Sequence, residues 1–304
     1  MKIKYILAIG VLSSFANAID FNLEAGGWYI DWEQTSTSSD FVKKDALDVK
    51  YDIDKSIAAV IRGDLDIFNG INGSFEYYTT KLSSNDKKEI KGYNIGLSIL
   101  DKIPYIDVET KIIKSDFKGS IEAVDTSDES TLSSGTFKTK VNIWDFIVYP
   151  FNKYVGVGYR LYKYDFPQDV YLIRNSDDTL LKKGLINVEY KGHFYTLSVN
   201  NRRFTSNLKE YKGFVYDITG GVGKLEPKAP GFDKYIEKSD ASFLDLYGGY
   251  SYKVNEATKA YGITLGFRYN KIETKANKTS GDYSLMTEFN TEFYGPFINL
   301  NYKF

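Results

Sequence analysis

Residues 261–270 read YGITLGFRYN, and their side chains alternate in character along the whole stretch. The odd positions from Tyr261 to Tyr269 are apolar or aromatic, and the even positions from Gly262 to Asn270 are small or polar. Successive side chains of a β-strand point to opposite faces, so a period of two predicts a strand with one apolar face, and a helical period does not fit. Strands of about 9–11 residues with two such faces build transmembrane β-barrels.

The same alternation recurs elsewhere in the chain. Residues 154–162 read YVGVGYRLY, and residues 92–99 read GYNIGLSI. In both stretches every second residue is apolar, and glycine is frequent between the apolar positions. Small residues on one face relieve crowding inside a closed sheet. We therefore predict an all-β fold, a transmembrane antiparallel up-and-down β-barrel.

Short and long polar segments alternate between the predicted strands. The short segments are residues 69–73, 101–104, 149–154 and 255–259, and the long ones are residues 34–54, 83–88, 119–135, 167–183, 220–240 and 275–282. Bacterial barrels have this asymmetry, with short periplasmic turns and long outer loops. The pattern predicts about twelve strands, with ten or fourteen as alternatives, and an even number places both termini on one side.

A repeated pattern, Glu-x-x-Gly-x-x-x-x-Leu, begins at Glu89, Glu189 and Glu292. Its copies lie about a hundred residues apart, which indicates a module of four strands used three times. The alternative interpretation is that all strands of a barrel resemble one another. The repeat thus agrees with twelve strands without requiring them.

Residues 1–18 have the organisation of a signal peptide. Two lysines precede an apolar run over residues 5–12, and small residues follow up to Ala18. We predict cleavage after Ala18, which leaves residues 19–304 as a single barrel domain. No later segment is long and apolar enough for a transmembrane helix, so a membrane protein with this sequence would cross with strands.

The composition excludes several classes of function. The chain has no cysteine, so it forms neither a disulfide nor a thiolate metal site. Its 39 Lys and Arg residues balance 40 Asp and Glu residues, which gives no net basic charge for a nucleic-acid partner. Aromatic residues make up 16% of the chain, and tyrosine is the most frequent of them. A tyrosine ring suits a boundary that is apolar on one side and wet on the other.

The C-terminal stretch, residues 297–304, reads FINLNYKF and ends on Phe304. It resembles the C-terminal signal of outer-membrane proteins, which the barrel-assembly machinery reads. Residues 21–28, FNLEAGGW, residues 158–160, GYR, and residues 294–297, YGPF, resemble strands of small proteobacterial outer-membrane β-barrel proteins. The resemblance implies a Gram-negative outer membrane, recognition of the Phe304 strand by the assembly machinery, and contact with outer-membrane lipid and lipopolysaccharide. It implies no substrate.

No motif for catalysis or cofactor binding is recognisable. His193, the only histidine, lies five residues before Ser198, so the two side chains fall on opposite faces of a regular strand. Residues 219–225, TGGVGKL, lack the first glycine and the final hydroxyl of a phosphate-binding loop. The acidic residues of segment 125–129 lack the spacing of a calcium loop. We therefore expect no enzyme, no cofactor and no metal site, with a barrel lipid hydrolase as a less favoured alternative.

Charged residues on the polar faces of the predicted strands carry the functional hypothesis. They are Arg62, Asp64, Asp66, Asp107, Glu109, Lys111, Arg160 and Arg268. Such charges should face inward, because Arg or Lys facing lipid at mid-bilayer costs about 2–4 kcal/mol. They either line a narrow channel for small hydrophilic solutes or pair into a network that fills a structural or surface-interaction barrel. The sequence favours the channel slightly, and a soluble β-sandwich is the alternative to a membrane protein.

Overall fold

The computed structural model describes residues 21–39, 46–68, 70–81, 89–103, 106–125, 131–150, 152–174, 179–206, 208–228, 239–256, 259–280 and 283–303. In these residues twelve antiparallel strands form one closed barrel, which confirms the predicted fold and strand number. The strands are β1 (Phe21–Ser39), β2 (Ala46–Phe68), β3 (Ile71–Thr79), β4 (Glu89–Ile103), β5 (Ile106–Asp125), β6 (Thr131–Pro150), β7 (Val155–Arg174), β8 (Thr179–Asn200), β9 (Tyr211–Lys228), β10 (Ser239–Glu256), β11 (Lys259–Ser280) and β12 (Tyr283–Lys303). The predicted signal peptide and Phe304 lie outside the described residues.

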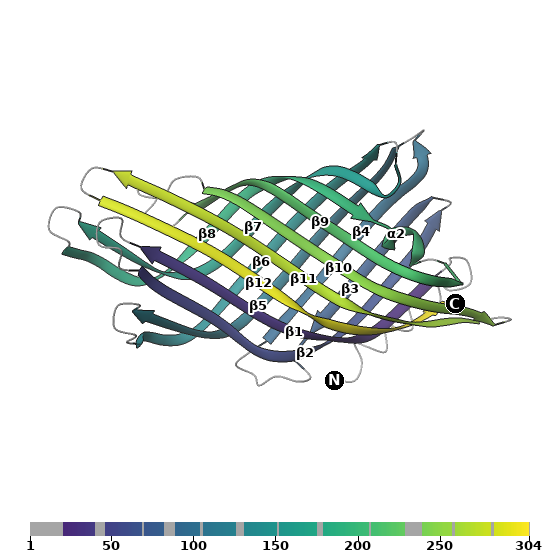
Figure 1. Cartoon of the computed structure of the whole chain (residues 1–304), viewed down its shortest axis with the longest axis horizontal. Coiled ribbons are helices and arrows are strands. Elements are labelled where there is room, and N and C mark those ends of the chain that lie inside the picture. Colours follow the sequence, from purple (N-terminus) through teal and green to yellow (C-terminus); the bar gives the residue numbers. More distant parts are fainter. Residues whose placement is uncertain are drawn as a thin grey trace.

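Each strand pairs with its neighbours in the chain, and β1 pairs with β12 to close the sheet (Figure 1). Closure removes the free edges at which an open sheet would pair with other chains. The register at the seam sets Asn22 opposite Lys303 and Ala25 opposite Leu300, so the first and last strands begin and end on the same side. Both ends of the barrel domain therefore lie at the end where the connections between strands are short.

Ten of the twelve strands are about twice as long as a bilayer requires. β2 has 23 residues, and β8 and β11 have 22 each, whereas about 9–11 span a membrane. Five of the six segments predicted as long outer loops are consequently strand for more than half of their length, and residues 83–88 lie outside the described residues. Residues 167–183, for example, continue β7 to Arg174 and begin β8 at Thr179. The loop prediction was wrong there because the antiparallel backbone pairing of β7 with β8 continues as far as Arg174 opposite Thr179.

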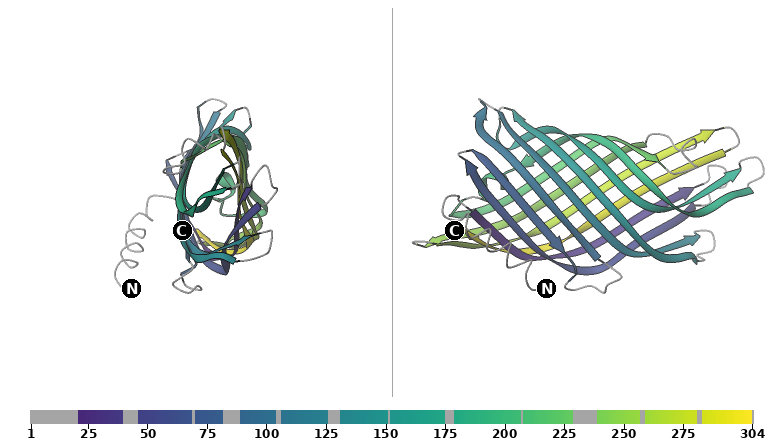
Figure 2. Two further views of the ribbon diagram at one scale, coloured as in Figure 1. Left: turned by 90° about the vertical axis from the view of Figure 1, so that its left-hand side faces the viewer. Right: turned by 180° about the vertical axis from the view of Figure 1, so that it is seen from behind.

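At this long-strand end the barrel narrows. β3 and β4 stop short, and β2 pairs directly with β5 above them, from Leu47 opposite Asp125 to Asp52 opposite Ser120. The ends of β12 and β7, which are not neighbours in the ring, also pair. The end view in Figure 2 accordingly shows an oval outline rather than an open circle.

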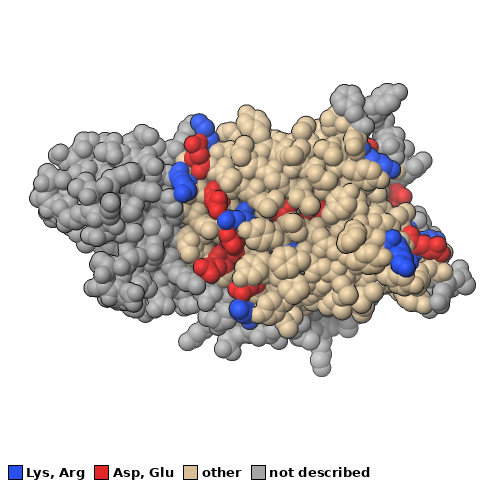
Figure 3. All heavy atoms as spheres, viewed as in Figure 1, with Lys and Arg blue, Asp and Glu red and all other residues tan. Residues whose placement is uncertain are grey.

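A belt of apolar side chains surrounds the outside of the barrel. Tyr261, Leu265 and Leu300 are 46, 53 and 62% exposed, as strands with an apolar face toward hydrocarbon require. The large apolar side chains exposed in the same way on other strands include Ile57, Ile61, Phe75, Ile95, Leu97, Trp144, Phe146, Val157, Tyr195, Leu197, Phe214, Val222, Tyr250 and Ile298. Figure 3 shows this face as a broad, mostly uncharged band between two borders that carry charged residues. A water-soluble sandwich would bury these side chains, so the soluble alternative is wrong.

One connection folds inward instead of turning tightly. After β8 the chain forms the short helix α2 (Arg202–Thr205), which lies within the outline of the barrel in Figure 2. Asn201 fixes its start, because its side-chain amide donates to the Phe214 carbonyl at 2.8 Å and accepts from the Tyr216 amide at 2.8 Å. Among the described residues no helix has the length and apolar character needed to cross a membrane.

Candidate functional site

The eight charged residues expected inside the barrel all lie on inward faces of strands. Arg62, Asp64, Asp107, Glu109, Arg160 and Arg268 are buried, and Asp66 and Lys111 are partly buried. The structure brings most of them into ion pairs that form a charged layer across the lumen.

Arg160 of β7 is the most enclosed of the predicted residues, at 2% exposed. Its guanidinium forms a fork with Asp145 of β6, at 2.6 Å from Nε to Oδ1 and 2.8 Å from Nη2 to Oδ2. The remaining Nη1 reaches Asp245 of β10 at 2.6 Å. Because β10 lies three strands away around the ring, this pair crosses the interior. The Phe243 ring packs 3.8 Å from the guanidinium carbon.

Arg268 of β11 makes the second crossing. Its two Nη atoms donate to both oxygens of Glu76 on β3, at 2.8 and 3.0 Å. Such a bidentate pair is the strongest geometry for an arginine and a carboxylate. Arg62 of β2, by contrast, pairs along its own strand with Asp64, at 2.9 and 2.5 Å.

Lys111 of β5 makes the third crossing, at 2.6 Å from Nζ to Asp217 Oδ2 on β9. The same Nζ lies 3.2 Å from Glu109, one position along on the same face of β5. Glu109 also accepts a hydrogen bond at 2.6 Å from the Tyr149 hydroxyl and one at 3.2 Å from the Asn200 amide. The carboxylate thus has a partner on each side despite its burial.

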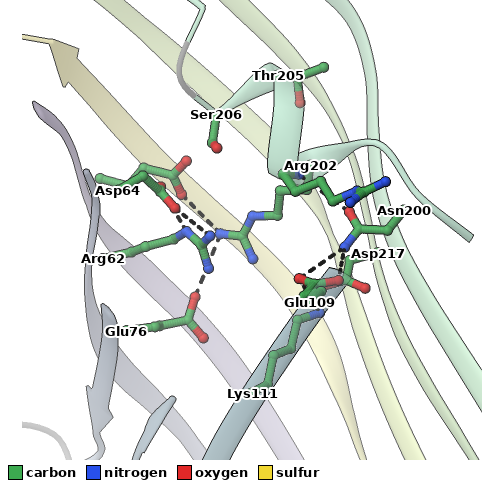
Figure 4. A network of polar contacts seen from close by, with 12 residues as sticks. Arg62, Asp64, Glu76, Glu109, Lys111, Asn200, Arg202, Thr205, Ser206 and Asp217 are labelled. Carbon is green, nitrogen blue, oxygen red and sulfur yellow. Dashed lines mark hydrogen bonds and ion pairs between the residues drawn. The ribbon is translucent and has the colours of Figure 1, made fainter. Parts of the chain in front are cut away.

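Helix α2 adds two arginines that the sequence analysis did not identify. Arg202 reaches Glu24 at 3.1 Å and Glu76 at 3.6 Å, and its guanidinium lies 3.6 Å from the centre of the Tyr247 ring. Figure 4 shows Arg202 entering the lumen beside the Arg62–Asp64 pair. Four helical residues are too few to give a periodic pattern. The available signal was the Arg202-Arg203 pair itself, which lies between two predicted strands.

Arg203 points to the other side of α2. It pairs with Asp107 at 3.1 Å, donates to the Lys153 carbonyl, and packs 3.6 Å above the Tyr149 ring. Lys253 of β10 holds the end of the helix by donating to the Thr205 and Ser206 carbonyls at 3.0 and 2.8 Å. Those carbonyls are among the groups that a helix C-terminus leaves without partners. The helix is therefore held by side chains of five strands, β1, β3, β5, β6 and β10, at the short-connection end of the lumen.

An aromatic layer occupies the lumen on the outer side of the ion pairs. Trp32 of β1 stacks on Phe117 of β5, with ring centres 5.7 Å apart. Tyr164 of β7 packs against Phe289 of β12, with ring centres 5.3 Å apart, and also donates to Gln34 of β1. The second contact joins two strands that are far apart in the chain, and all four rings are buried, so this level is packed like a protein core.

Two cavities remain among the described residues. The larger, about 170 Å³, lies between the aromatic layer and the ion pairs, and the smaller, about 40 Å³, lies beside α2. Arg202, Lys111 and Asp217 line both cavities and separate them. Charged side chains thus divide these two spaces of the lumen.

The remaining sequence candidates do not form a reactive centre. His193 lies on the outer surface, where its ring stacks on Tyr159 at 5.5 Å between centres. Ser198 is fully buried on the inner face, within hydrogen-bond distance of Tyr149 and Thr219. The prediction that His193 and Ser198 point to opposite faces is consistent with these positions. Within the described part of the chain no group of three potential metal ligands occurs, and Asp128 and Glu129 lie outside it.

Outside the barrel, lysines mark the border of the apolar belt on the long-strand side (Figure 3). On eight strands, and just after the end of β3, the first charged outward side chain beyond the belt is a lysine: Lys55, Lys81, Lys91, Lys114, Lys140, Lys163, Lys191, Lys224 and Lys271. We call this set the lysine girdle. Acidic side chains follow it, and Glu189 lies 2.5 Å from both Lys163 and Lys191. Hydrogen bonds from these two lysines lower the pKa of Glu189 to about 2.

Comparison with known proteins shows similarity in structure only. The outer membrane protease OmpT from Escherichia coli matches at 11% identity and a TM-score of 0.31, over 94% of this chain and 97% of that chain. The translocator domain of the autotransporter NalP from Neisseria meningitidis matches at 9% and 0.31, over 95% and 94%. A FadL homologue from Pseudomonas aeruginosa matches at 8% and 0.33, over 93% and 90%. No protein-family model matches the chain, and no curated protein matches its sequence.

These matches correct one prediction from the sequence. We expected the protein not to be an enzyme, because no catalytic motif is recognisable, but one of the matched barrels is a protease. A barrel of this kind places side chains from distant strands side by side, so short sequence motifs do not reveal a catalytic centre. The exclusion of an enzyme is therefore wrong as an inference from fold and motifs. At these identities and TM-scores the likeness concerns the barrel fold and transfers no activity.

Proposed function

We propose that the protein is an outer-membrane barrel with a closed lumen, which acts as a structural or surface-interaction protein rather than as an open channel. The observation that supports this best is the charged layer. Arg160, Lys111 and Arg268 each reach an acidic residue several strands away, and α2 inserts two more arginines between the walls. Solutes would have to break these pairs to pass.

The free energy needed to break the buried ion pairs favours a lumen that stays closed. Breaking a buried ion pair by removing one partner costs about 3–5 kcal/mol, because the other charge stays buried without compensation. Arg202 and Arg203 are each only 6% exposed, and both also pack on tyrosine rings. A solute that displaced α2 would expose Glu24 and Asp107 without their partners. Opening therefore requires more than thermal fluctuation of a surface loop.

The apolar belt and the lysine girdle support a membrane location and the orientation of the barrel. The belt faces hydrocarbon, and the girdle lies at the level where the phosphate groups of an outer leaflet would meet it. Lysine attracts phosphate as a point charge without requiring one fixed geometry. In this orientation the short connections and both ends of the barrel domain face the periplasm, and the long strands extend toward the cell surface.

Planar-bilayer recording tests the closed lumen. The wild-type protein should give no discrete conductance steps. Replacing both Arg202→Ser and Arg203→Ser should give steps that favour cations, because Glu24, Glu76 and Asp107 would then line the opening. Lys209→Ser with Lys212→Ser is the matched control, since both lysines are exposed at the same end, and this variant should stay silent. Discrete wild-type steps would refute closure.

Passage of small hydrophilic solutes is the second candidate function. The specific observation in its favour is the 170 Å³ cavity with charged side chains on its floor. Such a channel would conduct in the state described here without any change in α2. The wild-type recording therefore decides between the two candidates.

Lipopolysaccharide binding tests the proposed contact of the girdle. Replacing Lys163, Lys191 and Lys224 by Gln should reduce the lipopolysaccharide retained by the purified barrel severalfold. Replacing Lys153, Lys209 and Lys212 by Gln changes the same number of charges at the opposite end, and retention should not change. Equal retention by both triple variants would refute a lipid-facing role for the girdle.

A further inference from the structure

We infer that the 170 Å³ cavity is a binding site for a small aromatic carboxylate. The inference goes beyond the proposed function, because a closed barrel is complete without a ligand. It stands on three features of the cavity: its walls, its floor and the hydrogen-bond donors left without partners around it.

The walls of the cavity are aromatic and aliphatic. Trp28, Tyr162 and Phe243 line it together with Ile113 and Val141. Trp28 meets Tyr78 edge to face, with ring centres 5.7 Å apart, so its own ring is held in one orientation. Rigid ring faces and edges favour stacking with a flat aromatic ligand. For scale, an apolar cavity of about 150 Å³ in another protein holds benzene.

The floor of the cavity carries paired charges that include three arginines. Among the described lining residues Lys111, Arg160, Arg202 and Arg268 are basic, and Glu76, Asp145, Asp217 and Asp245 are acidic. Lys271 also lines the cavity, but its Nζ pairs with Glu273 and Glu292, which are partly exposed beyond the apolar belt. The floor charges thus balance, and the hydrogen-bond donors that remain decide between an anionic and a cationic ligand.

Three buried donors around the cavity have no hydrogen-bond partner within the described chain. They are Trp28 Nε1, Arg202 Nε and Arg268 Nε. Their residues are 3, 6 and 9% exposed. The two guanidinium groups use their Nη atoms on Glu24 and Glu76, and each has this one nitrogen left.

Leaving a buried donor unsatisfied costs about 1–3 kcal/mol, so three such donors at one cavity indicate a missing acceptor. Only one lining acceptor, Asn94 Oδ1, is without a partner in the same way. A carboxylate has two oxygens with several acceptor positions and no donor when ionised. Its acceptor oxygens match the free donors on the floor, and an attached ring matches the walls.

Titration calorimetry with benzoate on the detergent-purified full chain tests the inference. Benzyl alcohol and benzylamine carry the same ring with no charge and with positive charge. Benzoate should bind with 1:1 stoichiometry, benzyl alcohol at least tenfold more weakly, and benzylamine not at all. Water alone in the cavity predicts no binding of any of the three, and equal binding of all three would show a merely apolar space; either result overturns the inference.

Two tryptophans provide a matched pair of variants. Trp28→Phe keeps a ring in the wall but removes the free Nε1 donor, and we expect about tenfold weaker benzoate binding. Trp32→Phe makes the same change in a fully buried residue of the aromatic layer that does not line the cavity, and affinity should change less than twofold. Equal loss in both variants would overturn the assignment of Trp28.

A third variant tests the location of the site without changing a tryptophan. Val141→Phe fills part of the cavity from β6 with an apolar side chain and leaves every charged pair intact. It should abolish benzoate binding while the barrel remains folded and silent in bilayers. Unchanged binding in this variant would overturn the location of the site, and the silent recording keeps that outcome separate from the closed-lumen proposal.

Discussion

Removing the carboxylate of Glu76 is the sharpest test of the charged layer. Glu76 accepts both hydrogen bonds of the Arg268 fork at 2.8 and 3.0 Å and lies 3.6 Å from Arg202. Glu76→Gln keeps the size of the side chain but leaves two buried guanidinium groups with reduced compensation. We expect the free energy of unfolding to fall by about 3–5 kcal/mol, the cost of breaking a buried ion pair.

The matched control is Glu292→Gln. Glu292 pairs with Lys271 at 3.0 Å, but both side chains are 30% exposed beyond the apolar belt. Water already solvates this pair, so its loss should cost at most about 1 kcal/mol. Urea unfolding of the two variants in the same lipid vesicles, followed by tryptophan fluorescence, measures both values. Equal losses within about 1 kcal/mol would refute the reasoning that the layer is a desolvated cross-link.

A second substitution shows whether Glu76→Gln loses stability through an uncompensated charge or through poorer packing. In Glu76→Gln with Arg268→Met, one guanidinium that lost its partner is removed and replaced by an apolar side chain of similar length. Replacing both members of a buried ion pair by apolar groups is often neutral. The double variant should therefore recover part of the lost stability. If its loss equals the sum of the two single losses, the residues do not interact in the assumed way.

Three further predictions concern the membrane belt, the rim and the N-terminus. Leu265→Arg, in the middle of the belt, should destabilise the folded barrel in vesicles by about 2–4 kcal/mol, whereas Asn270→Arg on the other face of β11 should cost less; equal losses would contradict a lipid-facing Leu265. The lowered pKa of Glu189 means that its contribution to stability is present above its usual pKa near 4.5 and is lost as the pH falls toward 2. The stability difference between wild type and Glu189→Gln, under about 1 kcal/mol for such an exposed pair, should thus disappear in acid, and a difference that grows in acid would contradict the pairing. The mass of the protein purified from outer membranes should correspond to residues 19–304, and a mass that includes residues 1–18 would contradict cleavage after Ala18.

The sequence was sufficient to predict the faces of the strands. Alternation of side chains with a period of two places Leu265 outside and Arg268 inside, since it reflects only the pleat of the strand. The same logic put His193 and Ser198 on opposite faces, where the structure has them. The same alternation correctly assigned the charged residues to the inside and the apolar belt to the outside. It does so because the free energy of placing a charged side chain in hydrocarbon is unfavourable on each strand separately.

The sequence was not sufficient to predict the partners of those charges. The fork between Arg268 and Glu76 joins residues 192 positions apart, and no local pattern encodes how the ring of strands brings them together. The lengths of the strands were also missed, because the backbone pairing of β8 with β7 continues through residues 179–187, where the sequence does not alternate between apolar and polar residues. Helix α2 was not predicted for a third reason, because four residues are too few to show a helical pattern of apolar positions.

Charge balance explains why α2 belongs to the barrel and is not an accident of one connection. At the inner level the strands supply five buried carboxylates, Glu24, Asp64, Glu76, Asp107 and Glu109. Arg62, Lys111 and Arg268 pair with three of them, and the buried Lys253 donates to the carbonyls of α2. Glu24 and Asp107 accept hydrogen bonds from Arg202 and Arg203. Without the helix both would be buried charges with weakened compensation, which is costly in a low-dielectric interior. The wall and the helix therefore complete one electrostatic unit, and a variant that lost α2 alone would be expected to admit water and cations to the lumen in place of the two guanidinium groups.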